Sequence, residues 1–131
     1  MVELSNEVRK RLKQPTFWFL ATNMEDGSTQ VTPMWADVDD GYVILNTAVG
    51  RLKERNVRRD PRVTLTAADP EDPYTWIQIR GRVVEFIAGD AAFESIDALA
   101  KKYLGEDKYP YLEPGEQRVI LRIEPTTVVS G

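Results

Sequence analysis

The chain has 131 residues, of which 42% are hydrophobic, and a formal net charge of -4. This length fits one domain over residues 1–131 with a core of ordinary size. The sequence contains no cysteine and no histidine, which excludes thiolate and histidine metal sites and the Ser-His and Cys-His pairs of nucleophilic enzymes. We therefore expect no metal site, and we expect any chemistry to come from a bound cofactor.

The distribution of charge and of apolar residues bears on location and partners. No apolar run approaches the roughly 20 residues of a membrane span, and residues 1–14 are charged where a signal peptide is apolar. An acidic chain is also a poor nonspecific binder of nucleic acid. We expect a cytoplasmic protein that binds neither membrane nor nucleic acid.

The first predicted element is a short helix. Ser5 or Asn6 is its N-cap, Val8 and Leu12 face inward at a spacing of four, and Pro15 ends it.

Three strands are predicted next. Residues 16–23 are aromatic and β-branched, and the Asp-Gly pair at 26–27 predicts a tight turn after them. The run TQVTPMWADV contains Pro33, which has no N–H and so predicts an edge strand, a bulge or a break that faces a ligand. A second turn at 39–41 leads into the strand at 42–47, and together these strands read as a meander.

The second half adds three strands and a helix. The strand at 62–69 is followed by a long strand at 75–87, in which Gly81 predicts a bulge. Asp90 is the predicted N-cap of a helix to Leu104, with Gly105 just beyond its end. A final strand begins at Arg118. Six strands with inserted helices predict a mainly β, antiparallel barrel.

Six basic and two acidic residues crowd the segment NTAVGRLKERNVRRDPRV, residues 46–63. Gly50 gives a sharp exit from the preceding strand, and residues 51–60 predict a short helix that Pro61 ends. Arg51, together with the arginines four and seven residues later, occupies one arc of that helix, where we expect solvent.

Lys53 and Asn56 lie on the opposite arc, among the apolar residues that anchor the helix, where a polar side chain needs a partner. Two interpretations stay open. Either Lys53 extends to solvent and Asn56 bonds to backbone, or Lys53, Arg51 and the helix N-terminal amides form an anion site for a phosphate.

Residues 20–65 and 72–85, with weaker similarity at 96–105 and 118–125, resemble the pyridoxamine 5′-phosphate oxidase-like, FMN-binding split-barrel flavoproteins. Within that family they resemble the deazaflavin-dependent oxidoreductases that use coenzyme F420. The resemblance implies a six-stranded split β-barrel that forms a homodimer with two cofactor sites at the subunit junction.

The resemblance also implies three groups of cofactor-binding residues. The ring would lie along one strand, the phosphate and ribityl chain would meet the basic segment, and the second subunit would contribute the rest. In that order the groups are Val31, Thr32, Pro33, Met34 and Trp35; Asn46, Thr47, Gly50, Arg51, Lys53 and Asn56; and Trp76, Gln78 and Arg80. The ordinary alternatives are core packing for the two tryptophans and solvent exposure for Gln78 and Arg80.

The function that the resemblance implies is hydride transfer from reduced deazaflavin to an unsaturated small molecule, without a catalytic side chain. The alternatives are an FMN-dependent oxidase or flavin reductase, and a carrier that binds flavin, haem or tetrapyrrole without turnover. An oligonucleotide-binding barrel is disfavoured because the basic residues cluster instead of alternating with aromatics. Tyr103, Tyr109 and Tyr111 could cover the substrate or donate a proton, although packing is their usual role.

Overall fold

The computed structural model describes residues 1–131. Seven strands form one antiparallel sheet: β1 (Trp18–Asn23), β2 (Thr29–Met34), β3 (Asp37–Asp39), β4 (Tyr42–Ala48), β5 (Arg62–Ala68), β6 (Trp76–Ala88) and β7 (Arg118–Ser130). Three helices are inserted: α1 (Asn6–Lys13), α2 (Leu52–Arg59) and α3 (Asp90–Leu104). The predicted mainly β, antiparallel architecture is confirmed.

The predicted count of six strands is wrong, because the run TQVTPMWADV forms two strands. β2 ends at Met34 and β3 begins at Asp37, and the two pair with different neighbours, β2 with β1 and β3 with β4. We call the two residues between them, Trp35 and Ala36, the connector.

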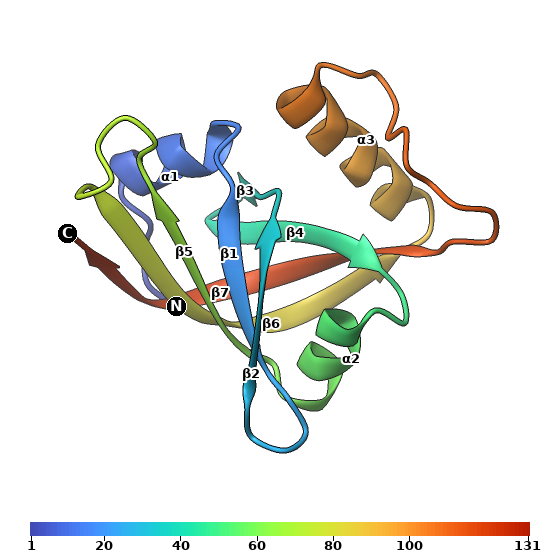
Figure 1. The fold of residues 1–131 in the computed structure, drawn as a ribbon, viewed down its shortest axis with the longest axis horizontal. Coiled ribbons are helices and arrows are strands. Elements are labelled where there is room, and N and C mark those ends of the chain that lie inside the picture. Colours follow the sequence, from blue (N-terminus) through green and yellow to red (C-terminus); the bar gives the residue numbers. More distant parts are fainter.

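The expected meander is also wrong. The strand order is β2-β1-β5-β6-β7-β4-β3, so β2 and β3 lie at the two edges of the sheet. The connector allows only three Cα–Cα steps between them, about 11 Å, so the sheet has to curl until its edges approach. Figure 1 shows the result, with β1 and β2 crossing β6 and β7. The edges do not pair, and the barrel stays open between them.

Two predictions about strand backbone are confirmed. Pro33 lies in the edge strand β2, opposite Phe19 of β1, where its missing N–H leaves no gap in the interior of the sheet. Gly81 lies at a register shift between β6 and β7. A Cβ at Gly81 would lie 2.3 Å from the backbone oxygen of Glu124, so no larger residue fits without a shift of the backbone.

The helix ends agree with the sequence except at one cap. Ser5 caps α1 by accepting a hydrogen bond from the Val8 amide at 3.3 Å, and Gly105 ends α3 with a φ of +74°. Asp90 was expected to cap α3, but Gly89 is the N-cap and Asp90 is the first helical residue. Its negative charge there interacts favourably with the positive end of the helix dipole. None of these helices has the length and apolar character that crossing a membrane requires.

The hydrophobic core fills the inside of the curled sheet. The strands supply most of its 19 buried side chains, α1 adds Val8 and Leu12, and α2 adds Val57. α3 lies outside this cluster and packs against β4, β6 and β7. The sheet is therefore covered on its inner side by α1 and α2 and on part of its outer side by α3.

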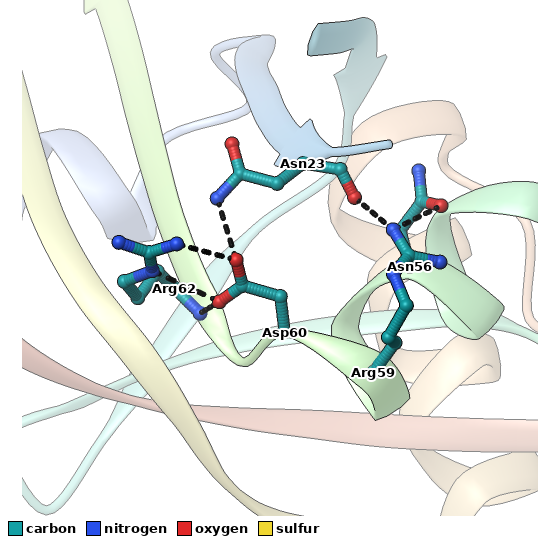
Figure 2. Close-up of polar contacts among 5 residues, drawn as sticks. All are labelled: Asn23, Asn56, Arg59, Asp60 and Arg62. Carbon is teal, nitrogen blue, oxygen red and sulfur yellow. Dashed lines mark hydrogen bonds and ion pairs between the residues drawn. The ribbon is translucent and has the colours of Figure 1, made fainter. Parts of the chain in front are cut away.

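Polar contacts attach the end of α2 to the end of β1 (Figure 2). Arg59 donates to the backbone oxygen of Asn23 at 2.5 Å and to the Asn56 side chain at 3.3 Å. Asn23 in turn donates to Asp60 at 3.0 Å, and Asp60 accepts from Arg62 at 2.7 Å. These bonds fix the end of α2 against the end of β1.

This cluster predicts a pH dependence of stability. Hydrogen bonds from Arg62, and then from Asn23, lower the pKa of Asp60 below its ordinary 3.8. A lowered folded pKa stabilises the fold above the unfolded pKa, and that contribution is lost as the pH falls below it. We expect Asp60→Asn to lower the urea midpoint at about pH 7, with the difference from wild type closing towards about pH 2. Glu25→Gln, at an exposed residue without an ion pair, is the control. A difference that is constant with pH would contradict this account.

Candidate functional site

A hollow of about 190 Å³ opens where the two sheet edges approach. It lies between the end of β2, β4, the beginning of α2, α3 and the segment 105–117 that leads into β7. Seven of its twelve lining residues are hydrophobic, and the whole set is Phe17, Pro33, Met34, Trp35, Asn46, Arg51, Lys53, Ile96, Leu99, Tyr109, Tyr111 and Arg118.

The hollow gathers six of the residues that the sequence analysis selected for the cofactor: Pro33, Met34, Trp35, Asn46, Arg51 and Lys53. In a meander, β2 and β4 would be close neighbours in the sheet. They are instead near opposite edges of the sheet, and they come together because the sheet curls.

Aromatic rings form the apolar wall of the hollow. Trp35 stacks on Tyr103 with ring centroids 5.3 Å apart and an angle of 13°, and Tyr109 meets the Trp35 ring edge-on at 6.0 Å. The Tyr103 hydroxyl accepts a hydrogen bond from the Ala36 amide at 3.0 Å and donates to the Thr16 oxygen at 2.6 Å. Burial raises the pKa of Tyr103. Tyr103 therefore holds the connector in place.

Lys102 holds the same connector from its other side. Its ammonium donates to the backbone oxygens of Ala36 and, at 2.9 Å, of Leu12, and it lies 3.5 Å from the Asp37 carboxylate. Burial lowers the pKa of Lys102, and the charge of Asp37 opposes that shift. Both backbone groups of Ala36, which pair with no strand, are thus bonded to side chains of α3.

The opposite wall is cationic, and Arg118 is its buried member. Arg118 is 2% exposed, and its Nε donates to the Asn46 side chain at 3.0 Å. Asn46 donates in turn to the Ala92 oxygen of α3 at 2.8 Å. Arg118 also forms an ion pair with Glu116 at 3.3 Å. Burial lowers the pKa of Arg118, and its position is fixed by β4, by α3 through Asn46, and by the 105–117 segment.

Lys53 differs from its neighbours because its half-buried ammonium has no hydrogen bond and no ion pair. Burial, followed by the positive charges of Arg51 and Arg118, lowers the pKa of Lys53. The N-terminus of α2 is equally open, since Arg51 makes no side-chain cap and the amides of 52–54 have no acceptor. Three cations and free amides thus converge on one side of the hollow, and an anion there would offset the half-buried charge of Lys53.

The structure turns two predicted cofactor residues away from the hollow. Asn56 is 1% exposed and its amide donates to the Thr22 hydroxyl at 3.1 Å, so it attaches α2 to β1 through a side chain and not through the backbone bond that the packing interpretation expected. Thr47 follows Asn46 on a strand and therefore points to the opposite face. Its buried hydroxyl has no partner. Gly50 lies at the turn before α2 with a φ of +94°, and its amide donates to Glu54.

The other predicted residues lie outside the hollow of a single chain. Val31 and Thr32 precede Pro33 on β2, with Val31 exposed. Trp76, Gln78 and Arg80 lie on β6, and the Arg80 guanidinium bonds to the Gln78 side chain at 3.2 Å. Their assignment to the site of a second subunit stays a prediction.

The sequence analysis missed Phe17, Ile96, Leu99 and Arg118 as lining residues. The first three carry no signal that separates them from core residues. Arg118 does carry one, because an arginine that opens the apolar run RVIL has to find a partner when the strand is buried.

Tyr103→Phe tests whether the Tyr103 hydroxyl holds the connector in place. We expect the free energy of unfolding to fall by about 1–3 kcal/mol, because the Ala36 amide and the Thr16 oxygen lose their partner while the ring stays stacked on Trp35. Tyr111→Phe is the matched control: Tyr111 is 65% exposed with no hydrogen bond, and we expect a change within about 0.5 kcal/mol. Urea denaturation measures both variants, and equal effects would show that the Tyr103 hydroxyl does not hold the connector.

Comparisons with known proteins give a family for the chain. A comparison with curated proteins gives no match. Among solved structures, an F420 reductase is 27% identical over 96% of this chain and 98% of its own, with a TM-score of 0.82. A conserved hypothetical protein from Mycobacterium tuberculosis is 26% identical over 99% and 85%, with a TM-score of 0.77. HupZ of Group A Streptococcus is 16% identical over 97% and 94%, with a TM-score of 0.68, which shows the fold alone.

The family match covers nearly the whole chain. The model of the pyridoxamine 5′-phosphate oxidase family matches residues 4–130, from the residue before Ser5 to the end of β7. The open, curled sheet agrees with the split barrel that the sequence predicted. The chain belongs to the pyridoxamine 5′-phosphate oxidase family.

Proposed function

We propose that this chain is an oxidoreductase that binds coenzyme F420 and reduces an unsaturated small molecule with a hydride from the reduced deazaflavin. The observation that carries the proposal is the unpartnered, half-buried ammonium of Lys53, which lines the same hollow as Arg51 and Arg118 beside an apolar wall. The similarity to a solved F420 reductase at 27% identity supports the choice of cofactor.

The lining residues fit the two chemical parts of such a cofactor. Lys53, Arg51 and the free amides of α2 suit a phosphate, since charge-assisted and backbone donors converge there. Pro33, Met34 and Trp35 offer an apolar surface for a ring system. When bound, the cofactor supplies the hydride. The chain's own part is to bind and orient the ligand and to exclude water from it, which needs no catalytic side chain.

The size of the hollow supports a homodimer. At about 190 Å³ it is smaller than the roughly 300–1,000 Å³ of typical ligand sites, so one chain offers only part of the site. The outer face next to it is apolar: Phe19 of β1 and Val31 of β2 are 47% and 58% exposed. We propose that a second copy covers this face and contributes Trp76, Gln78 and Arg80.

FMN is the second candidate cofactor, favoured by the family match to pyridoxamine 5′-phosphate oxidase. The phosphate contacts proposed here suit either ligand, so binding has to be measured. Fluorescence titration of the purified protein with FMN and with F420 gives the preference, and a yellow protein that retains FMN through purification favours the flavin. A carrier without turnover would bind a ligand yet give no substrate-dependent oxidation of reduced F420 with enones or quinones.

Lys53→Ala tests the phosphate contact. We expect cofactor binding to weaken by about 1–3 kcal/mol, the range for a hydrogen bond to a charged group, with stability unchanged or improved because a half-buried charge without a partner is removed. Arg55→Ala is the matched control, since Arg55 is an exposed cation of the same helix with no partner. We expect its effect on affinity to be within about 0.5 kcal/mol. Unchanged affinity with a large loss of stability in Lys53→Ala would assign Lys53 to the fold.

A further inference from the structure

One carboxylate lies among the three cations of the hollow. Glu116, in the 105–117 segment, is mostly buried, with 11% of its side chain exposed. Its Oε2 lies 3.3 Å from Arg118 and its Oε1 lies 3.7 Å from Arg51. Glu116 therefore joins two arginines that both line the hollow, while Lys53, which lines it too, has no carboxylate partner.

The two ion pairs of Glu116 differ in how readily the arginine can leave the carboxylate. Arg118 is buried and is also bonded to Asn46, so its pair with Glu116 is part of the packed structure. The Arg51 side chain is 48% exposed, and its distance to Glu116 is at the long end for an ion pair. Exposed pairs of this kind contribute little and rearrange easily. Of the two arginines paired with Glu116, Arg51 is thus the one that can leave it without disturbing the packed structure.

We propose that Glu116 sets the affinity of this anion site: it holds Arg51 in the ligand-free chain and yields it to an incoming phosphate. This inference rests on the phosphate site of the proposed function. The carboxylate lowers the affinity of the site, because an anion has to displace it from Arg51 and is repelled by its charge.

The test compares Glu116→Gln with wild type, using inorganic pyrophosphate followed by calorimetry. Glutamine keeps an oxygen that can accept from Arg118 but removes the charge that holds Arg51. We expect pyrophosphate to bind about two- to five-fold more tightly, the range for losing one exposed ion pair. Glu113→Gln removes the same charge from an exposed position in the same segment with no arginine partner, and we expect no change from it.

Two further arms separate the possible roles. With FMN and riboflavin as ligands, the variant should tighten binding of FMN alone, since riboflavin carries no phosphate. In an Arg51→Ala background the effect of Glu116→Gln should vanish, because the double-mutant cycle isolates the coupling through Arg51. Tightening that persists without Arg51 overturns the exchange mechanism.

The remaining outcomes distinguish this inference from the proposed function. Unchanged pyrophosphate affinity in Glu116→Gln, with FMN or F420 still bound by wild type, overturns the inference alone. Tighter pyrophosphate binding without any cofactor-dependent turnover keeps the inference and removes the proposed function. Binding of pyrophosphate by neither protein overturns the anion site on which both depend.

Discussion

The fold depends on the connection between the two edges of its sheet. Only Trp35 and Ala36 separate β2 from β3, so the two edges cannot move far apart, yet they do not pair with each other. The backbone groups of Ala36 would be left without partners in this gap, a cost that proteins rarely accept. Side chains of α3 provide those partners, Tyr103 to the amide and Lys102 to the oxygen. α3 thus stabilises the connector between the two unpaired edges, and the barrel stays open there, where the hollow lies.

The hollow combines two environments that oppose each other energetically. The aromatic wall lowers the local polarity, and the same burial makes an unpaired ammonium at Lys53 unfavourable. A protein selected only for stability would place a carboxylate there, as it does beside Arg118. Lys53 has no such carboxylate, which leaves its ammonium free to bind the anion of the proposed ligand. A ligand with both a ring and an anion would contact the two walls together.

The sequence predicted local features well because each has a local cause. Pro33 at an edge, the bulge at Gly81 and the bounds of α2 follow from the backbone chemistry of single residues. The strand order failed because pairing between distant segments leaves no local signal, and the split at the connector lies inside a continuous β-like run. At the hollow, Lys53 and Arg51 lie in the wall, whereas strand alternation turns Thr47 to the opposite face from Asn46. Their roles in cofactor binding stay predictions. Arg118 was missed because its burial depends on α3 and the 105–117 segment.

The same segment that completes the hollow also limits what can enter it. Residues 105–117 bring Tyr109 against Trp35 on the apolar side and Glu116 against Arg51 on the charged side. A shift of this segment would change both walls at once, since the Tyr109 ring also lies 5.1 Å from the Arg118 guanidinium. In the proposed site, the contacts of the ring and those of the phosphate are therefore coupled through one stretch of chain. A ligand with only one of the two parts meets half of the site, which is a physical reason for such a small hollow to prefer phosphorylated ring systems over free phosphate or a bare ring.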